Sequence, residues 1–276
     1  MHKKACIIGD PVAHSRSPMI HNHWLKQLGI DGLYDHAHVA PEQLPSFVGK
    51  MQSMGYVGAN CTIPHKETVI KLCNHISDTA KALGAVNTIW FENNQIYGDN
   101  TDVEGFLGAL DYNANGWDKD LKKAVVIGAG GAARAVIYGL IQSGVKQIYC
   151  VNRSMERAQS LANQFGAQII PISLYNMPLA LQDTRLLINT TSLGMKGQPP
   201  LTIDLSPLHP DAVVNDIVYV PLETSLFKAA HDRNLKSVSG LDMLLFQAVS
   251  GFERWFGTRP KVTDELRQLL QKDIET

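Results

Sequence analysis

The segment KAVVIGAGGAARAVIYGLIQSG, residues 123–144, decides how the chain is interpreted. A short apolar run leads into a turn that holds Gly128, Gly130 and Ala133 in G-x-G-x-x-A spacing, and an apolar helical pattern follows. The first glycine lets the chain turn sharply, the second lets the backbone come close to a ligand, and a small third residue lets the helix pack tightly on the strand. The segment therefore predicts a strand, a glycine turn and a helix, as in an α/β fold with parallel strands.

Strand-like runs alternate with helical patterns in the chain after this segment. Because each strand is followed by a helix and then by another strand, the strands are expected to lie parallel in one sheet. The pattern from residue 102 to residue 237 predicts a doubly wound unit of this kind. Its further expected strands are 146–154, 167–172 and 211–219, residues 185–195 are expected to form a strand and the loop after it, and a last strand begins at residue 235.

The first 101 residues alternate in the same way, but a predicted hairpin changes the sheet. Its two strands flank the residues ENN, so antiparallel pairing is added to parallel pairing and a mixed sheet is expected. The fold class is therefore α/β, with an N-terminal α/β domain that has a mixed sheet and a doubly wound second domain. The closing helices, 240–257 and 261–274, carry no pattern that assigns them to either domain. The expected strands of the first domain are 5–10, 33–39, 56–63, 85–91 and 95–100, and the expected helices are 17–30, 41–55, 65–74 and 77–84.

Composition excludes several classes of partner. The 276 residues carry a formal net charge of −1 with a sequence pI of about 6.8, and no lysine and arginine cluster stands out, so neither nucleic acid nor an anionic membrane is expected to bind. The first apolar run, Ala5 to Ile8, is too short for a signal peptide, and no stretch reaches the roughly 18 apolar residues of a membrane-spanning helix. A cytoplasmic protein is therefore expected. The four cysteines and ten histidines show no metal-ligand spacing, so no metal site is expected.

The strand after the glycine turn indicates which dinucleotide the turn would hold. Free N–H groups and the helix dipole favour anions at the start of the helix, which supports phosphate binding there over a plain tight turn. Sites for NAD usually carry Asp or Glu at the end of the next strand to bind the ribose 2′-hydroxyl. That position here holds NRS, residues 152–154, and an arginine can bind a 2′-phosphate with two hydrogen bonds. The sequence therefore favours NADP over NAD, with an exposed loop arginine as the alternative, and Ser154 is also expected to cap the next helix.

A lysine in NCTIPHKETV, residues 60–69, is the candidate catalytic cation. The segment predicts a strand end, a turn at Pro64 and the first turn of a helix, where the helix dipole disfavours the charge of Lys66. A lysine placed there for function can act as an acid or a base, and Asp102, at the expected domain junction, is its candidate partner. The alternative is a solvated Lys66 neutralised by Glu67, beside an Asp102 that caps a helix. Residue chemistry alone leaves both alternatives open.

Nine segments, in family order along nearly the whole chain, together resemble the shikimate dehydrogenase family. Three of them are highly specific in combination: the serine pair before a proline in GDPVAHSRSPMIHN (9–22), the T-x-P-x-K pattern in NCTIPHKE (60–67), and GDNTD (98–102). The glycine turn alone is not specific. The other segments are GAVNTI (84–89), GAGGAARA (128–135), NRS (152–154), NTTSLGM (189–195), DIVYVPLET (216–224) and GLDMLLFQA (240–248).

The resemblance implies a two-domain enzyme that uses NADP. The implied reaction is reversible hydride transfer between NADPH and 3-dehydroshikimate, giving shikimate, in aromatic amino-acid (chorismate) biosynthesis. Residues 1–101, with 238–276 returning to them, would form the substrate-binding and catalytic domain, and residues 102–237 would form the Rossmann domain that binds NADP. The partner would be a small molecule, and the protein would be a monomer or a homodimer. The alternatives are a quinate/shikimate dehydrogenase with NAD or mixed cofactor use, and a non-catalytic sensor of NADP or shikimate.

The same resemblance implies roles for individual residues. Lys66 and Asp102 would be the catalytic pair. Short hydroxyl and amide side chains suit a small substrate with one carboxylate and three hydroxyls. The substrate would be bound by Ser15, Ser17, Thr62, Lys66, Asn87, Asp102, Tyr219 and Gln247. NADP would be bound by Gly128, Ala129, Gly130, Gly131, Ala132, Asn152, Arg153, Ser154, Thr190, Ile217, Gly240 and Met243, and by Asp78 unless that residue only caps its helix.

Overall fold

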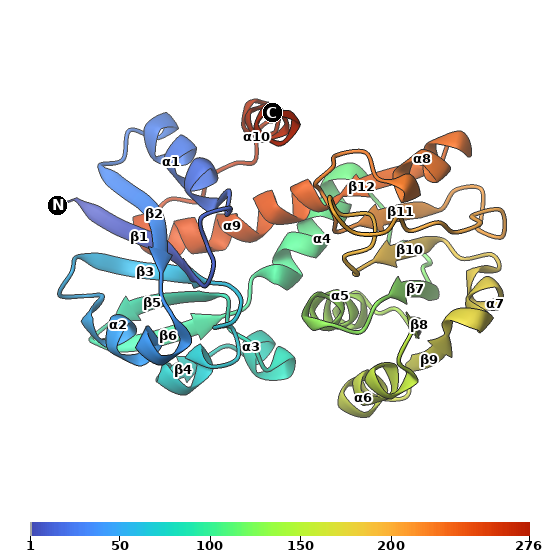
Figure 1. Ribbon diagram of the computed structural model, residues 1–276, viewed down its shortest axis with the longest axis horizontal. Helices are drawn as coiled ribbons and strands as arrows, with labels where there is room; N and C mark the ends of the chain where they lie inside the picture. Colours follow the sequence, from blue (N-terminus) through green and yellow to red (C-terminus); the bar gives the residue numbers. More distant parts are fainter. Residues whose placement is uncertain (1) are drawn as a thin grey trace. The chain divides into compact units, whose positions relative to one another are not determined.

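The computed structural model describes residues 2–276, which form two compact units (Figure 1). The first unit contains the chain up to residue 101 together with residues 247–270, and the second contains residues 102–246 and 271–276. The chain returns to the first unit inside one long helix, α9 (Gly240–Phe256).

The first unit is built on a six-stranded mixed sheet in the order β2-β1-β3-β5-β6-β4. Strand β1 is parallel to β2 and β3, β5 is antiparallel to β3 and β6, and β4 is parallel to β6. The predicted mixed sheet is therefore confirmed. The expected hairpin is β5–β6, and its turn holds Asn93 and Asn94 with positive φ, a conformation that asparagine tolerates. The bounds are β1 Lys3–Gly9, β2 Gly32–His38, β3 Tyr56–Cys61, β4 His75–Ile76, β5 Thr88–Glu92 and β6 Gln95–Asp99.

Short helices connect these strands, and local sequence explains where they begin and end. Helix α1 has Pro18 in its first turn. Proline is tolerated there because an N–H group in the first turn has no hydrogen-bond partner within the helix. Helix α3 begins after Ser77, whose hydroxyl accepts a hydrogen bond from the N–H of Ala80, and ends at Gly84 in the left-handed conformation. With η for a 3₁₀ helix, the bounds are α1 Ser17–Gln27, η1 Pro41–Gln43, α2 Leu44–Lys50, η2 Val69–Leu72 and α3 Asp78–Leu83.

The prediction of a helix over residues 65–74 is wrong. Residues 63–68 form turns, and only the short 3₁₀ helix η2 follows. The carbonyl of Lys66 accepts a hydrogen bond from the backbone N–H of Val86 at 2.8 Å, and the buried ring of His65 bonds the carbonyl of Val39 at 2.7 Å. In a helix, the carbonyl of Lys66 would accept a hydrogen bond from a backbone N–H of the same helix, but here it accepts one from Val86. The expected penalty from a helix dipole on Lys66 therefore does not arise.

The second unit is built on a six-stranded parallel sheet in the order β12-β11-β10-β7-β8-β9. Counted along the chain, these strands lie in the order 6-5-4-1-2-3, which is the Rossmann strand order read from the other edge. The predicted doubly wound unit is therefore confirmed. The bounds are β7 Lys123–Ile127, β8 Gln147–Asn152, β9 Ile169–Ser173, β10 Leu186–Asn189, β11 Val213–Asp216 and β12 Lys236–Ser239.

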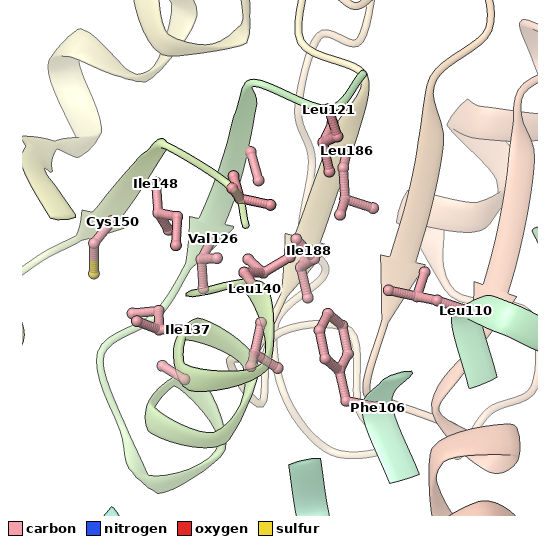
Figure 2. Close-up of a cluster of buried hydrophobic side chains, with 14 of the residues drawn as sticks. Phe106, Leu110, Leu121, Val126, Ile137, Leu140, Ile148, Cys150, Leu186 and Ile188 are labelled. Carbon is pink, nitrogen blue, oxygen red and sulfur yellow. The ribbon is translucent and has the colours of Figure 1, made fainter. Parts of the chain in front are cut away.

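Apolar side chains cover both faces of this sheet because successive strand residues point to opposite sides. Val126 belongs to a buried cluster with Phe106 of α4 and Leu140 of α5 (Figure 2). Its neighbour Val125 belongs to a second cluster, which includes Leu226 of α8. The helices of this unit before α9 are α4 Asp102–Asn113, α5 Gly131–Gln142, α6 Met155–Phe165, η3 Leu174–Asn176, α7 Met177–Leu181 and α8 Ser225–Asp232.

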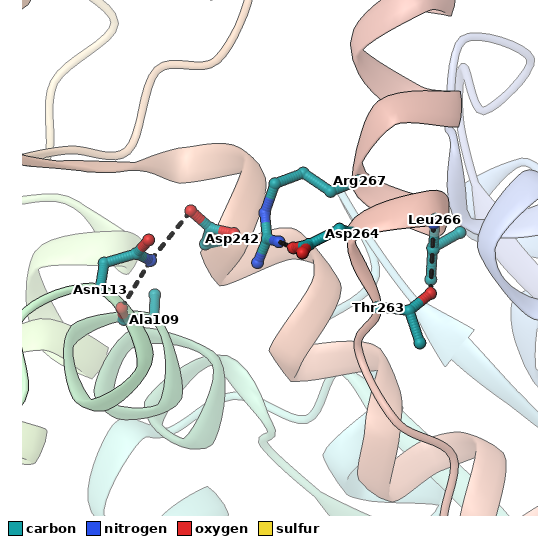
Figure 3. A network of polar contacts seen from close by, with 7 residues as sticks. All are labelled: Ala109, Asn113, Asp242, Thr263, Asp264, Leu266 and Arg267. Atoms are coloured by element: carbon teal, nitrogen blue, oxygen red, sulfur yellow. Dashed lines mark hydrogen bonds and ion pairs between the residues drawn. The ribbon is translucent and has the colours of Figure 1, made fainter.

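Side-chain hydrogen bonds hold α9 in each unit, and an ion pair lies within α10 (Asp264–Glu275). In the first unit, the indole of Trp255 donates to the carbonyl of Ile89 at 2.9 Å, and Arg267 pairs with Asp264 in the first turn of α10. In the second unit, Asn113 donates to Asp242 at 3.0 Å; Figure 3 shows this bond and the pair in α10. Within residues 2–276, none of the helices is both long and apolar enough to cross a membrane.

Candidate functional site

The glycine turn of the second unit forms an open cradle at the start of α5. Gly128 has a φ of +110°, and an added Cβ would lie 2.5 Å from Oγ1 of Thr190, so only glycine fits there. At Gly130 and Gly131 an added Cβ would meet no protein atom within 4 Å. The protein itself therefore leaves room for side chains at these two positions. Their absence exposes the backbone N–H groups of the helix start, which is how a phosphate is bound.

The turn lies where the strand order of the parallel sheet reverses, between β7 and β10. Ligands of such sheets bind outside the carboxyl ends of the strands at this point. The carbonyl of Ile127 accepts hydrogen bonds from both the backbone N–H and the hydroxyl of Thr190, at 2.8 and 2.7 Å, and joins the two loops. The expected cofactor residues that follow the carboxyl ends of strands in this sheet are Gly128–Ala132 after β7, Arg153 and Ser154 after β8, Thr190 after β10, Ile217 after β11 and Gly240 after β12; Asn152 ends β8 and Met243 lies in α9.

Arg153 is exposed in the turn after β8. The side chain of Asn152 fixes this turn by donating to the carbonyl of Ser154 at 2.9 Å. Ser154 occupies the cap position of α6, but its hydroxyl accepts no capping hydrogen bond, so the expected capping is not observed. Among residues 2–276, no carboxylate pairs with Arg153, which leaves its guanidinium available to an anionic ligand.

Asp216, at the end of β11, ties the loops around this cradle together. Its buried carboxylate accepts hydrogen bonds from Asn189 at 2.8 Å, from the hydroxyl of Thr224 at 2.8 Å and from the N–H of Val218 at 3.1 Å. Burial raises the pKa of the Asp216 carboxyl, and these three donors oppose that rise. The loop that carries Ile217 is therefore joined to the loop that follows β10.

In the first unit, a buried polar network holds Asn87. Its Oδ1 accepts hydrogen bonds from the backbone N–H of Thr101 at 2.9 Å and from the hydroxyl of Thr88 at 2.9 Å. Asn60 supports the same segment by donating to the carbonyl of Asn87 at 3.2 Å, and it accepts a hydrogen bond from Tyr34 at 2.6 Å. Because a backbone N–H can only donate, Oδ1 must face Thr101, and the amide group of Asn87 points the other way.

Further predicted substrate residues of the first unit contact other residues of that unit. The hydroxyls of Ser15 and Ser17 lie 3.2 Å apart at the start of α1. Gln247 contacts the hydroxyl of Thr101 at 3.4 Å, and so joins the network around Asn87. The methyl group of Thr62 would lie 2.5 Å from a Cβ added to Gly9, so the strand end β1 and the turn after β3 meet closely.

The predicted catalytic pair comes from both units. Lys66 is half-buried in the turn of the first unit, and its backbone is fixed by Val86. Asp102 is the first residue of α4 in the second unit, where the helix dipole favours a carboxylate. Tyr219, a predicted substrate residue, also belongs to the second unit, in the loop after β11.

Asp78 is the predicted cofactor residue that lies outside the second unit. It is the first residue of α3, next to the capping Ser77, and forms an exposed ion pair with Lys81 at 3.0 Å. Its observed contact is therefore local to its own helix. Among residues 2–276, no group of three or more His, Cys, Asp or Glu side chains is placed to hold a metal ion.

Three family models match successive parts of the chain. Residues 7–89 match the shikimate dehydrogenase substrate binding domain, residues 114–195 match shikimate/quinate 5-dehydrogenase, and residues 240–271 match the shikimate 5′-dehydrogenase C-terminal domain. A protein of Rhodopseudomonas palustris strain TIE-1 named shikimate dehydrogenase (NADP(+)) is 54% identical over 272 residues, which cover 99% of this chain and 97% of that protein. The chain belongs to the shikimate dehydrogenase family.

Solved structures agree with this family membership. Shikimate 5-dehydrogenase from Thermus thermophilus, in complex with NADP(H) and shikimate, is 32% identical with a TM-score of 0.85, over 98% of this chain and 99% of that chain. Quinate dehydrogenase from Corynebacterium glutamicum, in complex with NAD, is 28% identical with a TM-score of 0.88, over 98% of this chain and 99% of that chain. The predicted membership of the shikimate dehydrogenase family is thus confirmed over nearly the whole chain.

The structure of this shikimate dehydrogenase family member also adds polar residues that the sequence analysis did not single out. Asn60 and Thr101 hold Asn87 in one orientation, and Asp216 joins the loops around the glycine turn. All three lie inside segments that carry the family resemblance. Their chemistry alone did not mark them, because a buried amide, hydroxyl or carboxylate gains its role from partners that are distant in sequence.

Proposed function

We propose that this chain catalyses reversible hydride transfer between NADPH and 3-dehydroshikimate, giving shikimate, as a step of aromatic amino-acid (chorismate) biosynthesis. The observation that carries the proposal is the full-length similarity, 54% over 99% of the chain, to a protein named shikimate dehydrogenase (NADP(+)). The proposed roles of individual residues rest on the geometry within each unit.

The first unit is proposed to bind the substrate. Its polar side chains are short and supported by other polar groups, as expected for a site that reads a small molecule with one carboxylate and three hydroxyls. The hydroxyls of Ser15 and Ser17, together with Tyr219 of the second unit, suit the carboxylate. The amide groups of Asn87 and Gln247 suit the ring hydroxyls, and Thr62 is proposed to add a hydroxyl to the same binding.

The second unit is proposed to bind NADP, and its residues fit that group. The open positions at Gly130 and Gly131 leave room for a pyrophosphate at the helix start, and the free guanidinium of Arg153 can bind a 2′-phosphate in two hydrogen bonds. Thr190, Ile217, Gly240 and Met243 are proposed to line the nicotinamide side. Bound NADP would supply the hydride that this reaction transfers.

Lys66 and Asp102 are proposed to act on the oxygen that changes between ketone and hydroxyl. Negative charge develops on this oxygen when the ketone is reduced, and the ammonium group of Lys66 can stabilise the charge and donate the proton. Asp102 would orient Lys66 and bind the same hydroxyl. In the direction of oxidation, the pair would take the proton back.

Nicotinamide absorbance with shikimate and NADP+ tests the activity directly. Turnover that depends on both ligands is expected. Binding of both ligands, measured by calorimetry, without turnover would contradict the proposal and leave a non-catalytic sensor. The same experiment on Lys66→Ala protein separates enzymatic turnover from a contaminating dehydrogenase.

A quinate/shikimate dehydrogenase with NAD or mixed cofactor use is the second candidate. It is favoured by the match of residues 114–195 to a family model that covers both substrates, and by the fold shared with a quinate dehydrogenase. The absence of a carboxylate at residues 152–154 argues against NAD. Values of kcat/KM for shikimate and quinate, each with NADP+ and NAD+, decide between the two candidates.

We further propose that the enzyme works in the cytoplasm as a monomer or a homodimer. All four cysteines, three of them buried, are free thiols, which suits a reducing compartment. No nucleic-acid partner is expected from a chain with net charge −1. Light scattering coupled to gel filtration gives the oligomeric state, and fractionation of source cells gives the compartment.

A further inference from the structure

The second unit carries a pocket at the amino ends of its parallel strands, the opposite edge of the sheet from the glycine turn. Arg185 directly precedes β10 and Lys236 begins β12, and the strand register places both next to Val213, the first residue of β11. The side chains of Arg185 and Lys236 therefore lie close together at the amino ends of the strands. The loop between α4 and β7 supplies another wall, which includes Trp117 and Lys119.

The size of the pocket limits its occupant. Its volume is about 370 Å³. Pockets for small molecules range from roughly 300 to 1,000 Å³, so this one suits a small metabolite and is too small for a second dinucleotide.

The charges of the pocket favour an anion. Lys119, Arg185 and Lys236 supply three positive charges against the single carboxylate of Asp211, which leaves a net charge of 3 − 1 = +2. The ring of His209 lies 3.7 Å from Asp211 and accepts a hydrogen bond from one nitrogen of the Arg185 guanidinium at 3.0 Å, and the other N–H groups of that guanidinium remain for a ligand. Among residues 2–276, no acidic side chain pairs with Lys119 or Lys236, so a ligand would not have to displace an ion pair.

The walls of the pocket are fixed by hydrogen bonds. The indole of Trp117 donates to Asp111 of α4 at 2.8 Å, and its backbone N–H donates to the carbonyl of Ala114 at 2.8 Å. The carbonyl of Arg185 accepts from the N–H of Val213 at 2.9 Å, which fixes the start of β10 beside β11. Because the backbone that carries the three cations is already ordered, a ligand would have to order only the side-chain ends.

We propose that this pocket binds a small phosphorylated metabolite. A phosphate group offers the planar guanidinium of Arg185 a two-point contact, and its second charge can be met by the ammonium groups of Lys119 and Lys236. The site is separate from the glycine turn and is independent of the proposed reaction. Its occupant would bridge the starts of β10 and β12.

Titration of isotope-labelled protein with inorganic pyrophosphate tests this site. The enzyme is first saturated with NADP+, so that pyrophosphate cannot occupy the cofactor cradle at Arg153. Magnetic resonance then follows the indole N–H of Trp117, which a Trp117→Phe variant assigns among the four tryptophans of the chain. A saturable shift of this signal is expected with pyrophosphate, and no saturable shift is expected with sodium chloride at equal ionic strength.

Two sets of variants locate the binding. Arg185→Gln combined with Lys236→Gln should weaken pyrophosphate binding about tenfold or more, the usual effect of losing a charged hydrogen bond. Lys119→Gln, on a separate wall, should also weaken it, while Lys228→Gln on α8 should leave it unchanged. A signal that does not saturate, or variants at Arg185, Lys236 and Lys119 that bind as wild type, would overturn the proposal.

Discussion

At the scale of single residues, the orientation of Asn87 is the best-defined feature of the candidate site. The backbone N–H of Thr101 donates to Oδ1, so the amide group lies at the other end of the Asn87 side chain. A donor at this point suits an oxygen that accepts hydrogen bonds, such as a ring hydroxyl of the proposed substrate. Two predictions belong to this scale. Lys66 is proposed to transfer a proton, and Arg153 is proposed to bind the 2′-phosphate of NADP.

Replacement of Lys66 by alanine is expected to lower kcat by roughly 10²–10⁴-fold, the usual range for the loss of an acid/base group. Shikimate should still bind, because other polar residues hold its carboxylate and hydroxyls. Steady-state kinetics and calorimetry measure the two effects. Lys71→Ala, at an exposed position of η2, serves as the matched control. A kcat within a few-fold of wild type would remove Lys66 from the mechanism.

Replacement of Arg153 by alanine is expected to raise KM for NADP+ much more than KM for NAD+. The 2′-phosphate is the group that distinguishes the two cofactors, and a guanidinium can bind it in two hydrogen bonds. Arg157→Ala, on the exposed side of α6, should change neither value. Equal effects of Arg153→Ala on both cofactors would show that Arg153 does not read the 2′-phosphate.

At the scale of elements, buried aromatic rings join α1 to β2 and α9 in the first unit. The ring of His21 in α1 stacks on Tyr34 of β2 with centroids 4.1 Å apart, and lies 6.0 Å from the ring of Phe252 in α9. Burial lowers the pKa of His21 from 6.5 to about 3, with a smaller opposing effect from Asn60. The folded state therefore favours the neutral form of the His21 imidazole.

The free energy of unfolding is expected to decrease as the pH is lowered, because His21 is buried in its neutral form. Its pKa is lower in the folded state than in the unfolded state, so its contribution is full above about pH 6.5 and is lost as pH falls towards 3. The loss is at most about 1.4 kcal/mol per pH unit. Urea unfolding at several pH values should show a shallower decline for His21→Phe, whereas His14→Phe, at an exposed position, should decline as wild type. Equal slopes for His21→Phe and wild type would contradict this prediction.

Gly240→Ala is expected to destabilise the junction of β12 and α9 by about 1–3 kcal/mol, the usual cost of overpacking. An added Cβ would lie 2.0 Å from the carbonyl oxygen of Ile217, a backbone atom of the loop after β11. Gly49→Ala in α2 is the control: its Cβ would meet nothing within 4 Å, and alanine favours helices over glycine by about 0.5–1 kcal/mol. Urea unfolding should therefore give opposite signs for the two variants. A neutral Gly240→Ala would show that the junction relaxes.

At the scale of the whole molecule, the proposed reaction draws residues from both units. Serines, Asn87 and Lys66 belong to the first unit, whereas Asp102, Tyr219 and the cofactor cradle belong to the second. Neither unit alone contains the residues proposed for both ligands. A variant in the second unit that alters substrate binding would connect the units functionally.

Tyr219→Phe is expected to raise KM for shikimate roughly tenfold, because one hydrogen bond to a carboxylate is lost. KM for NADP+ and the unfolding midpoint in urea should stay near wild type, since the ring is retained. Tyr175→Phe, at a tyrosine that is 91% exposed in the same unit, should leave all three values unchanged. An unchanged KM for shikimate in Tyr219→Phe would place the substrate carboxylate on the first unit alone.

The sequence by itself determined the order of most strands and helices, the glycine turn and the family. These features depend on neighbours in the chain: apolar periodicity predicts each strand or helix, and the turn needs small residues at fixed spacing. The cap of α3 by Ser77 was predictable for the same reason, whereas Ser17, the predicted cap of α1, is the first residue of that helix and Arg16 precedes it without a capping hydrogen bond. The specific segments also identified the candidate residues, whose roles remain to be tested by substitution.

Only the tertiary structure decided the features that depend on distant partners. Val86 takes the carbonyl of Lys66, so the segment that looked helical forms turns instead. Thr101 sets the orientation of Asn87, and strand register brings Arg185 and Lys236 to one pocket. No local pattern encodes these contacts, because each joins groups from separate segments whose proximity arises only when the sheets form.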